Sequence, residues 1–157
     1  MNSLHPLQMM YPHDQVFLTS VLDFQPESQM MTGDFLVPSS QGYTLTPILY
    51  VTGEQALRCL NQLAYVLMWR LVESGSTGFE CIGCDTFVGA MTSYRMWLAD
   101  YHIRHKEMVV KDTTFSITLK VVRARASTQG QSIVRMGFDG PISGELTFAT
   151  KFDPAPP

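Results

Sequence analysis

Apolar residues recur at helical spacing through the middle of the chain, over residues 52–74. One face is formed by apolar residues at steps of three and four: Leu57, Leu60, Ala64, Leu67 and Leu71. Other apolar positions of the segment widen this face until little of the circumference is left for water. We therefore predict a helix over residues 52–74 that is buried by its own fold.

Local signals mark both ends of this helix. Thr52 is followed three residues later by Gln55, as in a capping box, and Gly75 lies just beyond the last turn, where a left-handed C-cap is needed. About 22 residues that rise about 1.5 Å each give a helix about 33 Å long. That length is large for a small domain, so the helix is predicted to be its central element.

Alternating apolar and polar residues predict strands on both sides of the helix. Before it, residues 16–24 and 30–37 are predicted to be strands that can pair as a hairpin. After it, three or four antiparallel strands are expected from the strand-like segments at 93–102, 115–121, 132–138 and 142–152. The clearest alternation is that of Phe115, Ile117, Leu119 and Val121.

This order of elements fits one antiparallel sheet wrapped around one long helix, the hotdog arrangement of the α+β class. We expect a single domain over residues 1–157, in which residues 1–12 form an arm or a short helical lead-in and residues 153–157 a frayed tail. One helix covers only one face of such a sheet, and the sheet edges usually need a partner. We therefore expect a homodimer or a dimer of dimers.

Composition narrows the classes of function. The chain has 157 residues, of which 45% are hydrophobic and 16% charged, and this is enough for a real core. Its net charge of -3 comes from 11 basic and 14 acidic residues without a run of one sign, so nucleic acid and membrane surfaces are not expected partners. The absence of a long apolar stretch and of a signal-peptide profile, together with three cysteines, an odd number, predicts a cytoplasmic protein with reduced thiols.

A stripe of polar residues follows the predicted helix. Glu54, Arg58, Asn61 and Tyr65 are spaced by four, three and four residues, and Gln62 lies beside them. Glu54 can pair with Arg58, and Asn61 can reach the Tyr65 hydroxyl one turn further on. An unsatisfied buried amide costs about 1 to 3 kcal/mol, so the two amides need partners or a wet cleft. They either cap backbone groups of the sheet or, with Tyr65, stabilise negative charge on a thioester carbonyl oxygen.

The same helix carries a family resemblance. Residues 59–65, Cys-Leu-Asn-Gln-Leu-Ala-Tyr, resemble the helix signature of the FcoT-like hotdog thioesterases. Phe-Ser at 115–116, Ser-Gly-Glu at 143–145 and Tyr11 before the first strand are also similar to that family. Family members either hydrolyse long-chain acyl-CoA or add glycine to an α,β-unsaturated acyl group on a carrier protein, in isonitrile and β-amino lipid pathways. The resemblance implies site roles for Asn61, Tyr65 and Tyr11, and no cofactor besides the CoA or phosphopantetheine that carries the substrate.

The segment before the helix departs from the family pattern. The family has Gly-His-Phe-Asn where this chain has Leu-Tyr-Val-Thr at 49–52, so Tyr50 replaces the His and Thr52 the Asn. An imidazole ordinarily titrates near pH 6.5 and can act as a base, whereas a phenol near pH 10 cannot. Tyr50 can still donate a hydrogen bond. The base would then be Glu54, another histidine or an incoming amine.

Two other groups of residues have side chains suited to ligand binding. Cys81, Cys84, His102 and His105 have the right types for a tetrahedral zinc site, but the two histidines lie three apart on a predicted strand and should point to opposite faces. We therefore expect no metal. A basic cluster around residues 104–111 is either a solvated loop or a grip on CoA phosphates or on an acidic carrier protein, through Arg104 and Lys106.

The sequence therefore predicts an enzyme that acts on a fatty or polyketide acyl thioester carried by CoA or by an acyl carrier protein. The reaction is hydrolysis or amine addition to an enoyl thioester; the alternatives are dehydration of a 3-hydroxyacyl thioester or a non-catalytic subunit that binds acyl groups or carrier protein. Predicted catalytic residues are Asn61, Tyr65, Tyr50 and Glu54. Predicted substrate-binding residues are Tyr11, Thr52, Arg58, Gln62, Arg104 and Lys106.

Overall fold

The computed structural model of the chain describes residues 5–41, 46, 48–125, 127 and 131–151. In this part of the chain six strands form one antiparallel sheet in the order β1-β2-β4-β5-β6-β3. The strands are β1 (Leu18–Gln25), β2 (Met30–Leu36), β3 (Met96–His105), β4 (Thr114–Arg125), β5 (Gln131–Asp139) and β6 (Ile142–Lys151). The helices are α1 (His5–Met10), the short 3-10 helix η1 (His13–Gln15), α2 (Gly53–Glu73) and α3 (Cys84–Thr92).

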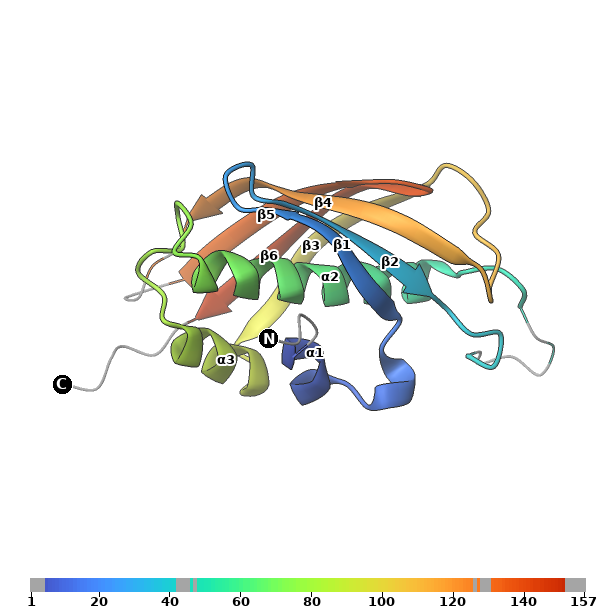
Figure 1. Ribbon diagram of the computed structural model, residues 1–157, viewed down its shortest axis with the longest axis horizontal. Helices are drawn as coiled ribbons and strands as arrows, with labels where there is room; N and C mark the ends of the chain where they lie inside the picture. The colour runs from blue at the N-terminus through green and yellow to red at the C-terminus, as the bar shows by residue number, and fades with distance from the viewer. Residues whose placement is uncertain (1–4, 42–45, 47, 126, 128–130, 152–157) are drawn as a thin grey trace.

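The sheet curves over α2, and α1 and α3 lie on the opposite side of that helix (Figure 1). Most of α2 is therefore buried, with side chains such as Leu60, Leu63 and Leu67 fully enclosed. The predicted α+β hotdog arrangement, an antiparallel sheet wrapped around one long central helix, is confirmed. No helix in the described part of the chain is both long enough and apolar enough to span a membrane.

The ends of α2 follow the local signals in the sequence. The Thr52 hydroxyl accepts a hydrogen bond from the Gln55 N–H at 3.4 Å, and Gln55 Oε1 accepts one from the Thr52 N–H at 3.1 Å. This reciprocal pair is the predicted capping box. At the other end Gly75 has a φ of +62°, the left-handed conformation that a C-cap glycine supplies.

A glycine lets the helix approach the sheet closely. A Cβ atom on Gly33 of β2 would lie 2.6 Å from Leu18 Cδ1 and 2.8 Å from Leu63 Cδ1. Leu18 belongs to β1 and Leu63 to α2, so the missing side chain leaves room for both to pack over β2. The core beneath the β1–β2 hairpin depends on this gap.

The N-terminal segment contains the short helix α1, in agreement with the predicted helical lead-in. The structure differs from the predicted elements in two places. The nine-residue helix α3 was not predicted, since about two and a half turns give too little periodicity to detect. β3 begins at residue 96 rather than 93, because Tyr94 has a φ of +58° and so cannot continue a strand. The predicted tail, residues 153–157, lies outside the described residues.

A substitution at Gly144 tests how closely β3 pairs with β6. It has a φ of +147°, and a Cβ atom there would collide with the carbonyl oxygen of His102 on β3. We expect Gly144→Ala to lower the free energy of unfolding by about 2 kcal/mol or more, measured by urea denaturation. Gly89→Ala in α3 is the matched control: its Cβ meets nothing within 4 Å, and alanine should stabilise the helix by about 0.5 to 1 kcal/mol. Equal effects of the two substitutions would contradict this account.

Candidate functional site

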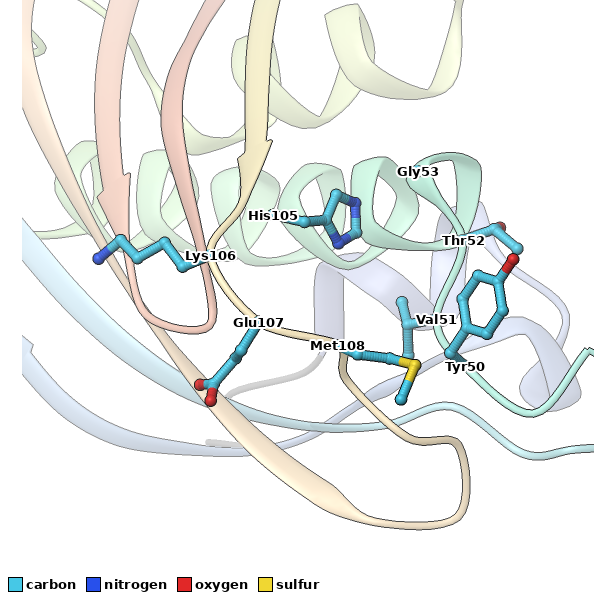
Figure 2. A pocket seen from close by; sticks show the side chains of 8 residues that line it. All are labelled: Tyr50, Val51, Thr52, Gly53, His105, Lys106, Glu107 and Met108. Carbon is cyan, nitrogen blue, oxygen red and sulfur yellow. The ribbon is translucent and has the colours of Figure 1, made fainter.

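A cavity of about 620 Å³ lies at the N-terminal end of α2. Two segments that are far apart in the sequence form it: residues 50–53, before and at the start of the helix, and residues 105–108, at and just after the end of β3 (Figure 2). Its lining residues are Tyr50, Val51, Thr52, Gly53, His105, Lys106, Glu107 and Met108. Of the predicted site residues, Tyr50, Thr52 and Lys106 are in this group.

A short backbone ladder holds the two segments together. The Val51 N–H donates to the Val109 carbonyl at 2.8 Å, and the Lys111 N–H donates to the Leu49 carbonyl at 2.9 Å. Val51 is buried in the core. Because successive side chains of an extended segment point to opposite sides, its neighbours Tyr50 and Thr52 are directed away from the core, toward the cavity.

One backbone carbonyl connects the start of α2 to the segment that follows β3. The Gln41 carbonyl accepts hydrogen bonds from Gln55 Nε2 at 2.7 Å and from Lys111 Nζ at 2.6 Å. Lys111 is only 4% exposed, so this residue of the predicted basic cluster supports the fold rather than forming a solvated loop. The first turn of α2 and the segment after β3 are thus both hydrogen-bonded to the Gln41 carbonyl.

His105 faces the cavity from the last position of β3. It lies opposite Ile142 of β6, which is a core residue, whereas His102 lies opposite the exposed Glu145. The two histidines therefore point to opposite faces of the sheet, as their spacing predicts. In the described part of the chain, no group of three or more His, Cys, Asp or Glu side chains is arranged to hold a metal ion. Figure 2 shows the His105 ring directed toward the first turn of α2, with Tyr50 and Met108 across the opening.

The two basic residues predicted to bind phosphate, Arg104 and Lys106, do not point into the cavity together. The Lys106 side chain points away from the opening and forms an ion pair with Asp139, both partners being well exposed (Figure 2). Hydrogen bonding and charge from Lys106 lower the pKa of Asp139. Arg104 does not line the cavity, and it lies opposite Ser143, on the face of β3 that His105 does not share. Binding of phosphate by Arg104 and Lys106 stays a prediction.

The polar stripe of α2 is real and runs from the cavity into the interior. Arg58 pairs with Glu54 at 3.5 Å, the pair that the spacing predicts. The guanidinium also contacts Gln15 and lies 5.5 Å from the centroid of the Phe17 ring. Arg58 is thereby held beneath the chain that leads from η1 into β1, away from the cavity lining.

Further along the stripe, Tyr65 of α2 lies near Tyr11, which follows α1. Burial raises the pKa of Tyr11, and the neighbouring Tyr65 raises it further while Arg58 opposes the shift. Burial also raises the pKa of Tyr65, whose ring packs 5.7 Å from that of Phe148. Tyr11 lines a second cavity, of about 390 Å³, between α1 and β1. Tyr11 and Tyr65 thus lie close enough to interact. The site roles that the resemblance implies for them stay a prediction.

The two amides of the stripe have different surroundings. Gln62 is fully buried; its Oε1 accepts from the Phe17 and Leu18 N–H groups at 2.8 and 3.0 Å, and its Nε2 donates to the Gln15 carbonyl at 2.7 Å. Gln62 therefore caps the start of β1, and its predicted substrate contact stays untested. Asn61 Oδ1 is buried and, among the described residues, has no hydrogen-bond partner. An orphaned acceptor of this kind needs an explanation, and a bound ligand is one.

The predicted site residues thus fall into two regions. Tyr50 and Thr52 lie at the start of α2, whereas Tyr65 lies twelve residues beyond Gly53, about 18 Å along the helix axis. His105 also belongs to the first region. From the sequence, which other histidine could act as a base stays open, and His105 is named only as a possible zinc ligand. The alternation of β3 placed it on one of two faces, but only the pairing with β6 shows which face meets the helix.

Comparisons with known proteins show the fold. No family model matches the chain, and no curated protein matches it in sequence. A hypothetical thioesterase protein with coenzyme A from Streptococcus pneumoniae TIGR4 has a TM-score of 0.51 at 8% identity, covering 87% of this chain and 88% of that one. Thioesterase superfamily member 2 from Mus musculus has a TM-score of 0.50 at 11% identity, covering 96% and 94%. The dehydratase heterocomplex ApeI:P from Xenorhabdus doucetiae has a TM-score of 0.54 at 12% identity, covering 89% and 86%.

These neighbours share the hotdog fold with the chain and include members of the thioesterase superfamily. At identities of 8 to 12% they show the fold alone. The resemblance to the FcoT-like family therefore stays a prediction.

The different surroundings of the two amides have measurable consequences for stability. Gln62→Leu leaves two backbone N–H groups and one carbonyl buried without partners, so we expect a loss of about 3 kcal/mol or more in the free energy of unfolding. Asn61→Leu removes an acceptor that has no partner among the described residues, so its effect should be near zero or stabilising. Chemical denaturation of both variants measures the difference, and a large destabilisation by Asn61→Leu would contradict the assignment.

The buried Tyr65 and the partly buried Tyr11 predict a loss of stability at alkaline pH. Unfolded tyrosine titrates near pH 10, and the pKa values of Tyr11 and Tyr65 are raised in the folded protein. Above pH 10 the unfolded chain therefore releases protons that the folded chain retains, and stability falls as pH rises. Tyr11→Phe should make the fall in melting temperature between pH 9 and 11 shallower. Tyr94→Phe, which removes an exposed hydroxyl, is the matched control.

Proposed function

We propose that the protein hydrolyses acyl thioesters carried on CoA or on the phosphopantetheine of a carrier protein, with the reacting carbonyl in the cavity at the first turn of α2. The observation that supports this most directly is the open cavity of about 620 Å³ beside the start of a 21-residue buried helix. A hotdog-fold neighbour that holds coenzyme A supports the choice of substrate class.

The helix end suits a reaction in which negative charge grows on a carbonyl oxygen. The first intrahelical hydrogen bond of α2 runs from the Ala56 N–H to the Thr52 carbonyl at 2.8 Å, so the Gly53 N–H precedes the ladder and lies at the positive end of the helix dipole. Preorganised N–H donors of this kind stabilise a thioester oxyanion. Tyr50, on the cavity wall, would supply a hydroxyl donor to the same carbonyl or to the leaving group.

The interior region supports a second candidate, addition of an amine such as glycine to an enoyl thioester. Its supporting observation is the orphaned Asn61 Oδ1, since an amine supplies the N–H donor that this acceptor lacks. Tyr11 and Tyr65, to which the family resemblance gives site roles, lie close to each other and would bind the carbonyl. In this second candidate the acyl group enters from the cavity between α1 and β1.

Two further alternatives follow from the fold. A dehydratase heterocomplex is among the structural neighbours, and dehydration of a 3-hydroxyacyl thioester would use an acid and a base in the same cavity. A non-catalytic subunit would bind acyl thioester or carrier protein without turnover.

The functional unit is proposed to be a homodimer. β3 is at one edge of the sheet, and it carries the exposed aromatic side chains of Trp97 and Tyr101. An exposed edge strand with apolar side chains is a ready surface for pairing with a second copy. A dimer of dimers would need a further surface.

Product analysis separates these reactions. Purified protein is incubated with saturated acyl-CoA, with enoyl-CoA plus glycine, and with 3-hydroxyacyl-CoA, each also on a carrier protein, and products are followed by mass. Free acid and thiol from the saturated substrate are expected. A glycine adduct would favour the second candidate, and loss of water would favour dehydration. Binding of acyl-CoA without any product would sink the catalytic proposal.

A blocking substitution tests which region is used. A Cβ atom on Gly53 would meet nothing within 4 Å, so Gly53→Leu should fold normally and place its side chain at the mouth of the cavity. We expect its kcat/KM to fall at least about tenfold, equivalent to about 1.4 kcal/mol. Gly89→Leu, at an equally open glycine of α3, is the control and should keep full activity. Full activity of Gly53→Leu with loss of activity in Asn61→Ala would move the reaction to the interior region.

A further inference from the structure

We infer that His105 is the proton-transfer residue of the thioester reaction, in place of a base on the segment that precedes the helix. This inference rests on the proposed function. It names the base that Tyr50, as a phenol, cannot supply. It comes from the geometry of the cavity, in which a strand-borne imidazole faces the first turn of α2 (Figure 2).

Among the described residues that line the cavity, the titratable side chains are those of Tyr50, His105, Lys106 and Glu107. Histidine is the type of side chain whose charge ordinarily changes between pH 5 and 8. Lys106 is engaged by Asp139, and the side chains of Lys106 and Glu107 point away from the opening (Figure 2). Of the described lining residues, His105 and Tyr50 are left as the titratable groups whose side chains face the opening.

The backbone around His105 is well anchored. β3 pairs with β6 up to the last residue, where His105 lies opposite Ile142, and the Lys106 N–H then donates to the Pro141 carbonyl at 2.9 Å. The segment that follows is held through the Val109 carbonyl by the Val51 N–H. An imidazole on a strand end fixed from both sides is preorganised in the way that proton transfer requires.

In hydrolysis the inferred step is balanced as follows. The oxygen of one water molecule bonds to the thioester carbonyl carbon while one of its protons passes to the His105 imidazole. The negative charge that forms on the carbonyl oxygen faces the start of α2. The carbon–sulfur bond then breaks, and the imidazolium returns the proton to the departing sulfur. The products are a carboxylic acid and a free thiol, with no change in oxidation state.

The same strand provides the matched control. His102 lies three residues earlier, is also exposed, and points to the opposite face beside Glu145. His105→Gln and His102→Gln therefore make the same chemical change on the two faces of β3. Both side chains are exposed, so neither change should disturb folding, which circular dichroism and thermal unfolding verify.

The test is the pH profile of thioester hydrolysis with the substrate that the wild-type chain turns over. We expect His105→Gln to lower kcat at least about 100-fold, the usual lower range for loss of a general base, with little change in KM. It should also abolish the decline in kcat on the acidic side of the profile. His102→Gln should keep both the rate and the shape of the profile.

Several results would overturn the inference. If His105→Gln keeps the wild-type rate or the acidic limb while the wild-type chain hydrolyses thioesters, His105 is not the proton-transfer residue and the proposed function still stands. If KM rises and kcat does not fall, His105 only binds substrate. If the wild-type chain turns over no thioester, the proposed function fails and the inference fails with it. Imidazole NMR signals provide a readout besides activity: a thioether analogue of acyl-CoA should shift the signals of His105 and leave those of His102 in place.

Discussion

Burial of one long helix on nearly all sides is the constraint on which the rest of this structure depends. The concave face of the sheet covers α2 from one side, and α1 and α3 cover it from the other (Figure 1). Polar groups on such a helix must find partners inside the protein or lie at its open end. Gln62 finds three backbone partners at the start of β1, and Arg58 finds Glu54 and Gln15. The first turn lies beside an open cavity instead, so this is where charge can develop on a substrate.

Features that depend on local chemistry could be predicted from the sequence. The capping box at Thr52 and the left-handed Gly75 mark the two ends of α2, as predicted. The Glu54–Arg58 ion pair could be predicted from the spacing of four residues alone. Features that depend on distant contacts could not. The arm that covers the polar stripe, the carbonyl of Gln41 that collects two side chains, and the face of β3 that meets the helix are all set by tertiary packing. The predicted stripe therefore contained both structural and candidate functional residues, and spacing could not separate them.

The two polar regions of α2 differ in kind. The interior region is closed: Tyr65 is only 8% exposed, and Asn61 Oδ1 lacks a partner among the described residues. A ligand there would have to satisfy that acceptor and to enter beneath α1. The region at the helix start is open, and the capping box and the backbone ladder already fix its backbone. A site that exchanges substrate, water and protons with solvent is better served by the second arrangement, because little reorganisation is needed on binding.

The position of His105 also gives a physical meaning to part of the family resemblance. The Ser-Gly-Glu sequence at 143–145 opens β6, and its central residue, Gly144, pairs with Ile103 of β3. Gly144 has a φ that side-chain-bearing residues rarely adopt, and its missing Cβ makes room for the carbonyl of His102. A residue with a side chain there would push β3 away from β6 two positions before His105, and the imidazole would leave the cavity wall. Glycine at 144 thus belongs to the fold and, through the register of one strand pair, to the geometry of the candidate site.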